Sequence, residues 1–116
     1  MPNKIIIRKK INNFNKKIFI PGDKSLSIRW VLISSLSNGV SKAQNLLMSE
    51  DVIAALKAIK TLGVKVVYNS KKCKIYGAGV NGYKYKKGIV INAENSGTLG
   101  RLILGLLVDA PEKIKL

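Results

Sequence analysis

The sequence predicts an α/β fold, in which strands and helices alternate along a chain of 116 residues. Short apolar runs rich in Ile and Val recur between polar turns, which is typical of strands. Longer segments carry apolar residues near helical spacing. From residue 17 the order is strand, helix, strand, helix, strand, strand, and a second round begins with strand, helix, strand. This order favours an α/β fold with crossover connections.

The first round begins with two predicted strands at 4–8 and 17–20, joined by a polar turn. Residues 26–37 predict a helix, which ends at Asn38-Gly39 because both residues tolerate the left-handed conformation. Residues 40–47 predict a short strand.

The next helix has the clearest pattern, with an apolar stripe from Val52 to Leu62. Ser49 is its predicted N-cap, acidic residues suit its positive end, and Gly63 ends it. Two strands then form a hairpin about the polar turn at 69–72; they span 64–68 and 73–77.

The second round follows a glycine-rich loop at 78–88. It comprises a strand at 89–91, a helix at 98–110 and the start of a strand at 113–116. Because the chain stops in an apolar strand, we expect the sequence to be a piece of a longer protein.

The charge is strongly basic, with a formal net charge of +15. Lysines supply most of it and are spread along the whole chain, which favours a solvated surface over a nucleic-acid site. No His is present, so Ser-His-Asp catalysis and histidine-ligated metals are excluded. The longest apolar run, 102–108, is too short to span a membrane, and the single Cys fits a reducing compartment. We expect a cytoplasmic protein.

Two predicted strand-to-helix corners carry the candidate chemistry. The first is PGDKSLSIR, at 21–29, and the second is NSGTLGR, at 95–101. A helix N-terminus presents unpaired N–H groups, and small residues let an anion approach them. Capping by Asp23 or Ser25, and by Asn95 or Ser96, is the alternative at each corner. Two of the three Arg residues fall in the first turns of these helices. The helix dipole disfavours a cation there, and capping does not require one. The pattern therefore indicates an anion site.

The same two motifs resemble those of the 5-enolpyruvylshikimate-3-phosphate synthase family. The stretch between them, LLMSEDVIAALKAIKTLGV, is similar as well, in order and spacing. The resemblance implies two domains built from βαβαββ units, the inside-out α/β barrel of the enolpyruvyl transferases. Residues 1–20 would then belong with the other domain, and 21–116 would be part of a substrate-binding domain.

The resemblance also implies an activity: transfer of the enolpyruvyl group from phosphoenolpyruvate to shikimate 3-phosphate, with release of phosphate and without metal or organic cofactor. Lys24, Ser25 and Arg29 would bind shikimate 3-phosphate. The catalytic residue Lys24 would also reach phosphoenolpyruvate. The residues that would line the phosphoenolpyruvate site are Asn95, Gly97 and Thr98; Arg101 and Asp51 are weaker matches. The resemblance implies a monomer at full length, with no nucleic-acid or membrane partner.

One departure from the family pattern is Glu94, where the family often has a small residue. Its negative charge beside an anion site is unfavourable unless the side chain points away. Three alternatives remain: a UDP-N-acetylglucosamine enolpyruvyl transferase, a basic nucleic-acid-binding module, and a non-catalytic fragment that serves as a partner. The first is disfavoured because that family has Lys-Asn at the position of Lys24-Ser25. We expect negligible turnover from these 116 residues alone.

Overall fold

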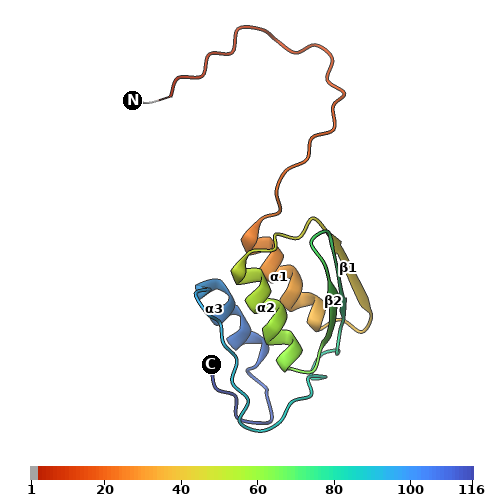
Figure 1. Ribbon diagram of the computed structural model, residues 1–116, viewed down its shortest axis with the longest axis vertical. Helices are drawn as coiled ribbons and strands as arrows, with labels where there is room; N and C mark the ends of the chain where they lie inside the picture. Colours follow the sequence, from red (N-terminus) through yellow and green to blue (C-terminus); the bar gives the residue numbers. More distant parts are fainter. Residues whose placement is uncertain (1–2) are drawn as a thin grey trace.

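The computed structural model describes residues 3–116 as three helices and a three-stranded sheet, reached through a long N-terminal segment (Figure 1). In chain order the elements are α1 (Lys24–Ser35), β1 (Val40–Gln44), α2 (Glu50–Thr61), β2 (Lys65–Tyr68), β3 (Lys72–Tyr76) and α3 (Gly97–Leu106). The helices lie together on one side of the sheet (Figure 1).

The helix predicted over 26–37 spans 24–35 and ends with the C-cap Leu36, before Asn38-Gly39. The N-caps of α1 and α2 are those that the sequence suggested. Asp23 caps α1, its carboxylate accepting the Leu26 N–H at 2.7 Å. Ser49 is the N-cap residue of α2 as predicted, although its side chain makes no capping bond. Gly63 follows the end of α2 at φ 86°, a left-handed conformation that glycine adopts at low cost.

The sheet has the order β1-β3-β2, and both outer strands run antiparallel to β3. The predicted hairpin of β2 and β3 is confirmed, with Val66 opposite Ile75. Since β1 and β2 both oppose β3, they are parallel to each other, and α2 connects them across β3. This is the crossover connection that the alternating pattern predicted.

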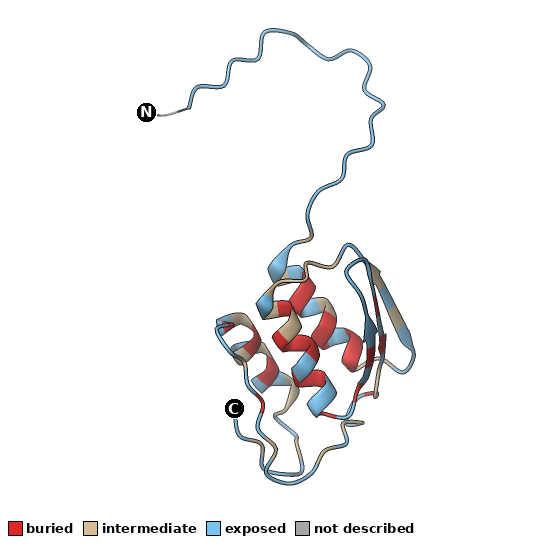
Figure 2. Ribbon diagram, viewed as in Figure 1, coloured by how far each residue is buried: buried red, intermediate tan, exposed pale blue. Residues whose placement is uncertain are grey.

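The core lies between the helices and the inner face of the sheet (Figure 2). Most of its largest fully buried side chains come from α1, α2, α3 and β3, among them Ile28, Leu56, Ile75 and Ile103. The free thiol of Cys73 is buried in this core. The stripe predicted on α2 is confirmed by the complete burial of Val52, Leu56 and Ile59.

The prediction of two N-terminal strands is wrong. Residues 4–8 and 17–20 are extended but unpaired, and their side chains are exposed, Ile5 and Phe19 each at 87%. A strand requires a neighbour for its backbone hydrogen bonds, and in residues 3–116 neither segment has one.

Four further predicted segments differ from the structure. The strand predicted over 40–47 ends at Gln44, because Asn45 adopts φ 59° and turns the chain. The segments 89–91 and 113–116 meet only in a single parallel bridge, Val90 with Lys115. The helix predicted to reach residue 110 ends at Leu106, before a turn that leads to Pro111. Among the described residues no helix is long and apolar enough to cross a membrane.

Candidate functional site

The first corner is fixed by close backbone packing between Gly22 and the loop after β1. A Cβ on Gly22 would lie 2.4 Å from the Asn45 carbonyl oxygen and 2.8 Å from the Leu47 nitrogen. The Asn45 side chain also donates to the Ile20 carbonyl at 2.8 Å, and the Leu47 N–H donates to the Ser27 hydroxyl at 3.2 Å. These contacts hold the start of α1 against the loop that leads into α2.

The charged groups of the first corner already have partners on the protein. The Lys24 ammonium lies 3.1 Å from an Asp51 carboxylate oxygen, with Lys24 half exposed and Asp51 mostly covered. The Arg29 guanidinium donates to the Ser25 hydroxyl one helical turn away. The structure therefore brings the residues predicted here together as two pairs, Lys24 with Asp51 and Ser25 with Arg29.

Of the two residues considered for capping at the first corner, Asp23 and Ser25, only Asp23 caps α1. The Asp23 carboxylate takes the capping role and occupies one N–H group of the first turn. Ser25 makes no cap, and its hydroxyl accepts from the Arg29 guanidinium. An anion here would be held mainly by the side-chain charges, whose hydrogen bonds contribute about 1.5–3 kcal/mol each.

At the second corner Ser96 is the N-cap. Its buried hydroxyl accepts the Leu99 N–H at 3.1 Å. Asn95 and Gly97 are exposed and Thr98 is half-buried, so their polar groups are accessible to a ligand. The Arg101 side chain folds back, its Nε donating to the Gly97 carbonyl at 3.1 Å. A Cβ on Gly97 would meet only that guanidinium, at 3.7 Å.

The Glu94 side chain, next to the second corner, pairs with a lysine on α2. Its carboxylate lies 3.8 Å from the Lys57 ammonium on α2, and its backbone adopts φ 50°. The Glu94 N–H donates to the Asn92 side chain at 2.8 Å, which supports this left-handed turn. The negative charge of Glu94, which is unfavourable beside an anion site, thus has a cation close to it.

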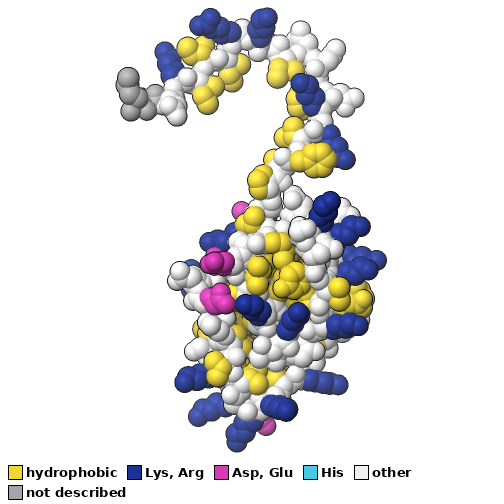
Figure 3. Space-filling view, in the orientation of Figure 1, with side chains coloured by type: hydrophobic (Ala, Val, Ile, Leu, Met, Phe, Trp, Pro, Cys, Tyr) yellow, Lys and Arg dark blue, Asp and Glu magenta, His cyan; other side chains and the backbone are white. Residues whose placement is uncertain are grey.

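The two helices that carry the corners, α1 and α3, begin toward the same end of the molecule. In Figure 1 all three helices begin toward the end at which the N-terminal segment leaves, and α3 packs against both α1 and α2. Figure 3 shows Lys and Arg side chains scattered over the visible face rather than gathered in one stripe. The corners differ from the rest of the basic surface because they combine cations with small hydroxyl and amide donors. This combination suits a phosphate or a carboxylate.

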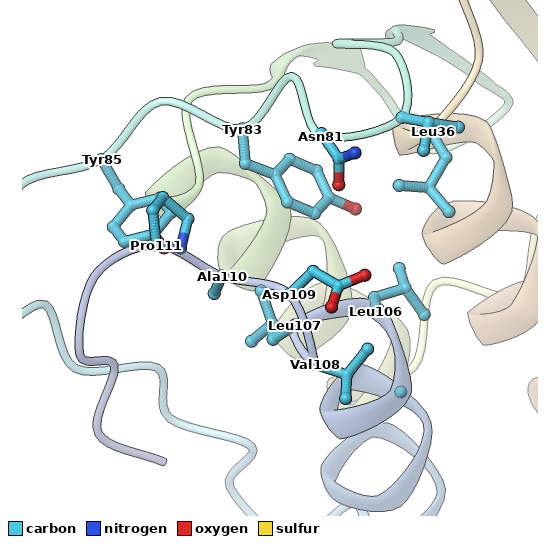
Figure 4. Close-up of a pocket in the computed structure, with 12 residues that line it drawn as sticks. Leu36, Asn81, Tyr83, Tyr85, Leu106, Leu107, Val108, Asp109, Ala110 and Pro111 are labelled. Atoms are coloured by element: carbon cyan, nitrogen blue, oxygen red, sulfur yellow. The ribbon is translucent and has the colours of Figure 1, made fainter.

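A hollow of about 520 Å³ lies elsewhere, between the loop at 80–85 and the chain that follows α3 (Figure 4). Its walls include Leu36, Tyr83, Leu106 and Pro111, and its one charged lining group is the carboxylate of Asp109. No predicted site residue lines it. An apolar surface with a carboxylate does not attract anions, so the hollow does not suit the anionic ligand that the motifs predict.

Sequence reasoning missed two contributors to the corners. Asn45 fixes the loop through its left-handed backbone and its bond to Ile20, and only its tolerance of that conformation is visible in the sequence. Lys57 is one of many lysines, and nothing local distinguishes the one that contacts Glu94.

Comparison with known proteins finds, over nearly the whole chain, the family that the two motifs resemble. Residues 8–116 match the family "EPSP synthase (3-phosphoshikimate 1-carboxyvinyltransferase)". The chain is 43% identical over 99 residues to the 3-phosphoshikimate 1-carboxyvinyltransferase of Ruthia magnifica, covering 85% of this chain and 22% of that one. It is 45% identical over 96 residues to that of Vesicomyosocius okutanii, covering 83% of this chain and 22% of that one.

A solved structure, EPSP synthase from Acinetobacter baumannii, matches with a TM-score of 0.71 and 32% identity over 79% of this chain and 21% of that one. The chain thus spans about a fifth of the length of these relatives. The family resemblance expected from the two motifs is confirmed, as is the α/β fold class. This chain belongs to the EPSP synthase family.

Proposed function

We propose that this chain supplies part of the active site of a 3-phosphoshikimate 1-carboxyvinyltransferase. Such an enzyme transfers the enolpyruvyl group of phosphoenolpyruvate to the 5-hydroxyl of shikimate 3-phosphate and releases phosphate, in the pathway to chorismate and the aromatic amino acids. The single observation that carries the proposal is that both family motifs form cationic, donor-rich corners at one end of the molecule. Both substrates are anions, which such corners suit.

In this proposal the first corner binds the phosphate of shikimate 3-phosphate through Lys24, Ser25 and Arg29. The second corner, with Asn95, Gly97 and Thr98 as its binding residues, takes phosphoenolpyruvate. Lys24 would reach both substrates, because its four-carbon stem is long and its ammonium is half exposed. Arg101 and Asp51 contact protein groups of the two corners: Arg101 donates to the Gly97 carbonyl, and Asp51 pairs with Lys24.

The reaction proceeds by addition and elimination. The 5-hydroxyl gives up its proton as its oxygen bonds to C2 of phosphoenolpyruvate, while C3 gains a proton. The resulting tetrahedral intermediate then loses phosphate from C2 and a proton from C3, which restores the double bond. An ammonium at the phosphoenolpyruvate phosphate stabilises the charge that builds on this leaving group, which is the role proposed for Lys24 as catalytic residue. The groups that transfer the protons are proposed to lie outside this chain.

We also propose that residues 1–20 belong with a second domain, and that 21–116 are part of the substrate-binding domain. In support, residues 3–20 make no strand pairing here and expose most of their apolar side chains. A cytoplasmic, monomeric enzyme without metal or organic cofactor completes the proposal.

The test is a nitrogen-15 NMR titration of the 116-residue chain with shikimate 3-phosphate and then phosphoenolpyruvate. The expected result is shifted amides at 24–29 and, after the second substrate, at 95–101. Lys24→Ala should reduce the response to both. Random-sequence DNA serves as the competing ligand: amide shifts caused by DNA but not by millimolar substrate would replace the proposal with nucleic-acid binding.

A further inference from the structure

We propose that Lys57, on α2, is a positioning residue of the second corner. Its ammonium holds the Glu94 carboxylate and compensates the negative charge, so that an anion can bind beside Asn95. The proposal rests on the function proposed above for that corner. It assigns a role to a side chain that belongs to neither motif.

Glu94 is close enough to the corner for its charge to matter. It directly precedes Asn95, and three residues of even fully extended chain place it at most about 11 Å from Gly97. This is comparable to the distance over which salt screens charges, about 10 Å at 0.1 M. A free carboxylate there would repel a phosphoenolpyruvate phosphate, which is itself negatively charged.

The geometry turns that carboxylate toward a cation. The left-handed backbone at Glu94, φ 50°, is braced by the Asn92 side chain. It places the carboxylate 3.8 Å from the Lys57 ammonium. Lys57 lies near the middle of α2, a helix anchored in the core by Leu56 and Ile59, so its stem starts from a rigid position.

The same helix contacts both corners through charges of opposite sign. Asp51, in the first turn of α2, pairs with Lys24, and Lys57 pairs with Glu94. Six residues of helix separate Asp51 from Lys57, about 9 Å along the axis. Both side chains of the pair are exposed, Lys57 at 66% and Glu94 at 42%, so the pair contributes little to folding stability. Its effect is expected on the electrostatic potential felt by a bound anion.

The experiment measures the dissociation constant of phosphoenolpyruvate, in the presence of shikimate 3-phosphate, for four chains: the parent, Lys57→Ala, Glu94→Gln and the double variant. At low salt Lys57→Ala should weaken binding about two- to threefold and Glu94→Gln should strengthen it by a similar factor. In the Glu94→Gln background, Lys57→Ala should have almost no effect. Lys57→Arg should bind like the parent, and the Lys57→Ala effect should fade at high salt.

The outcomes separate this inference from the proposed function. If Lys57→Ala weakens phosphoenolpyruvate binding equally with and without Glu94, Lys57 does not act through Glu94. That result would overturn this inference and leave the proposed function standing. The same holds if Lys57→Ala changes nothing. If the parent chain does not bind phosphoenolpyruvate, both the proposed function and this inference fail. Urea unfolding of each variant checks that the exposed substitutions leave the fold intact.

Discussion

The contact between Gly22 and the loop after β1 can be tested by one added methyl group. In Gly22→Ala the new Cβ would overlap the Asn45 carbonyl oxygen at 2.4 Å and crowd the Leu47 nitrogen at 2.8 Å. Both neighbours are backbone atoms, so no side chain can rotate away and the loop must move. Overpacking of this kind costs about 1–3 kcal/mol. For a domain of this size, that lowers Tm by roughly 4–12 °C.

Gly39→Ala is the matched control, because a Cβ there meets nothing within 4 Å. Urea unfolding followed by circular dichroism should give a clearly lower midpoint for Gly22→Ala and a nearly unchanged one for Gly39→Ala. The same displacement shifts Lys24 relative to Asp51, so shikimate 3-phosphate affinity should also fall in Gly22→Ala alone. Equal urea midpoints for the two variants would refute the argument that backbone packing fixes this corner.

Three other predictions concern the corners and the core. Lys24→Ala should weaken substrate binding more than Ser25→Ala, since it removes a charge shared by both substrates; calorimetry showing equal losses would contradict the assigned roles. Gly97→Ala should leave the urea midpoint unchanged or raised, because its Cβ makes only an ordinary 3.7 Å contact, while phosphoenolpyruvate affinity falls; a destabilised variant would count against this. Burial raises the pKa of the Cys73 thiol and the Tyr83 hydroxyl above their ordinary 9.0 and 10.0. The unfolded chain then loses these protons first, so the free energy of unfolding should decrease as pH rises above about 9. Urea titrations against pH check this, and Cys73→Ala should remove the earlier part of the decrease.

Local signals predicted much of the fold. The α2 stripe, the hairpin turn and Gly63 depend on residues a few positions apart, and the structure confirms them. The segments 4–8 and 17–20 have strand composition, but pairing requires a partner, which composition does not reveal. The end of α3 was missed for a related reason: apolar residues continue past Leu106 although the helix does not.

The candidate site divides in the same way. Lys24, Ser25 and Arg29 are adjacent in sequence or one helical turn apart, so their meeting follows from the motif. Contacts between distant segments do not follow. The pairing of Lys24 with Asp51 and of Lys57 with Glu94 depends on how the helices pack, and lysines are too frequent here for charge alone to identify the partner.

The unpaired segment at 3–20 also has a practical consequence for handling the protein. Ile5, Ile7 and Phe19 are among the apolar side chains it exposes, on a backbone whose hydrogen-bonding groups are open to a neighbouring molecule. Such β-prone stretches promote aggregation, and the lysine doublets at 9–10 and 16–17 are the kind of gatekeeper residue that slows it. Preparations of this chain should therefore stay soluble at low ionic strength and self-associate as salt screens those lysines.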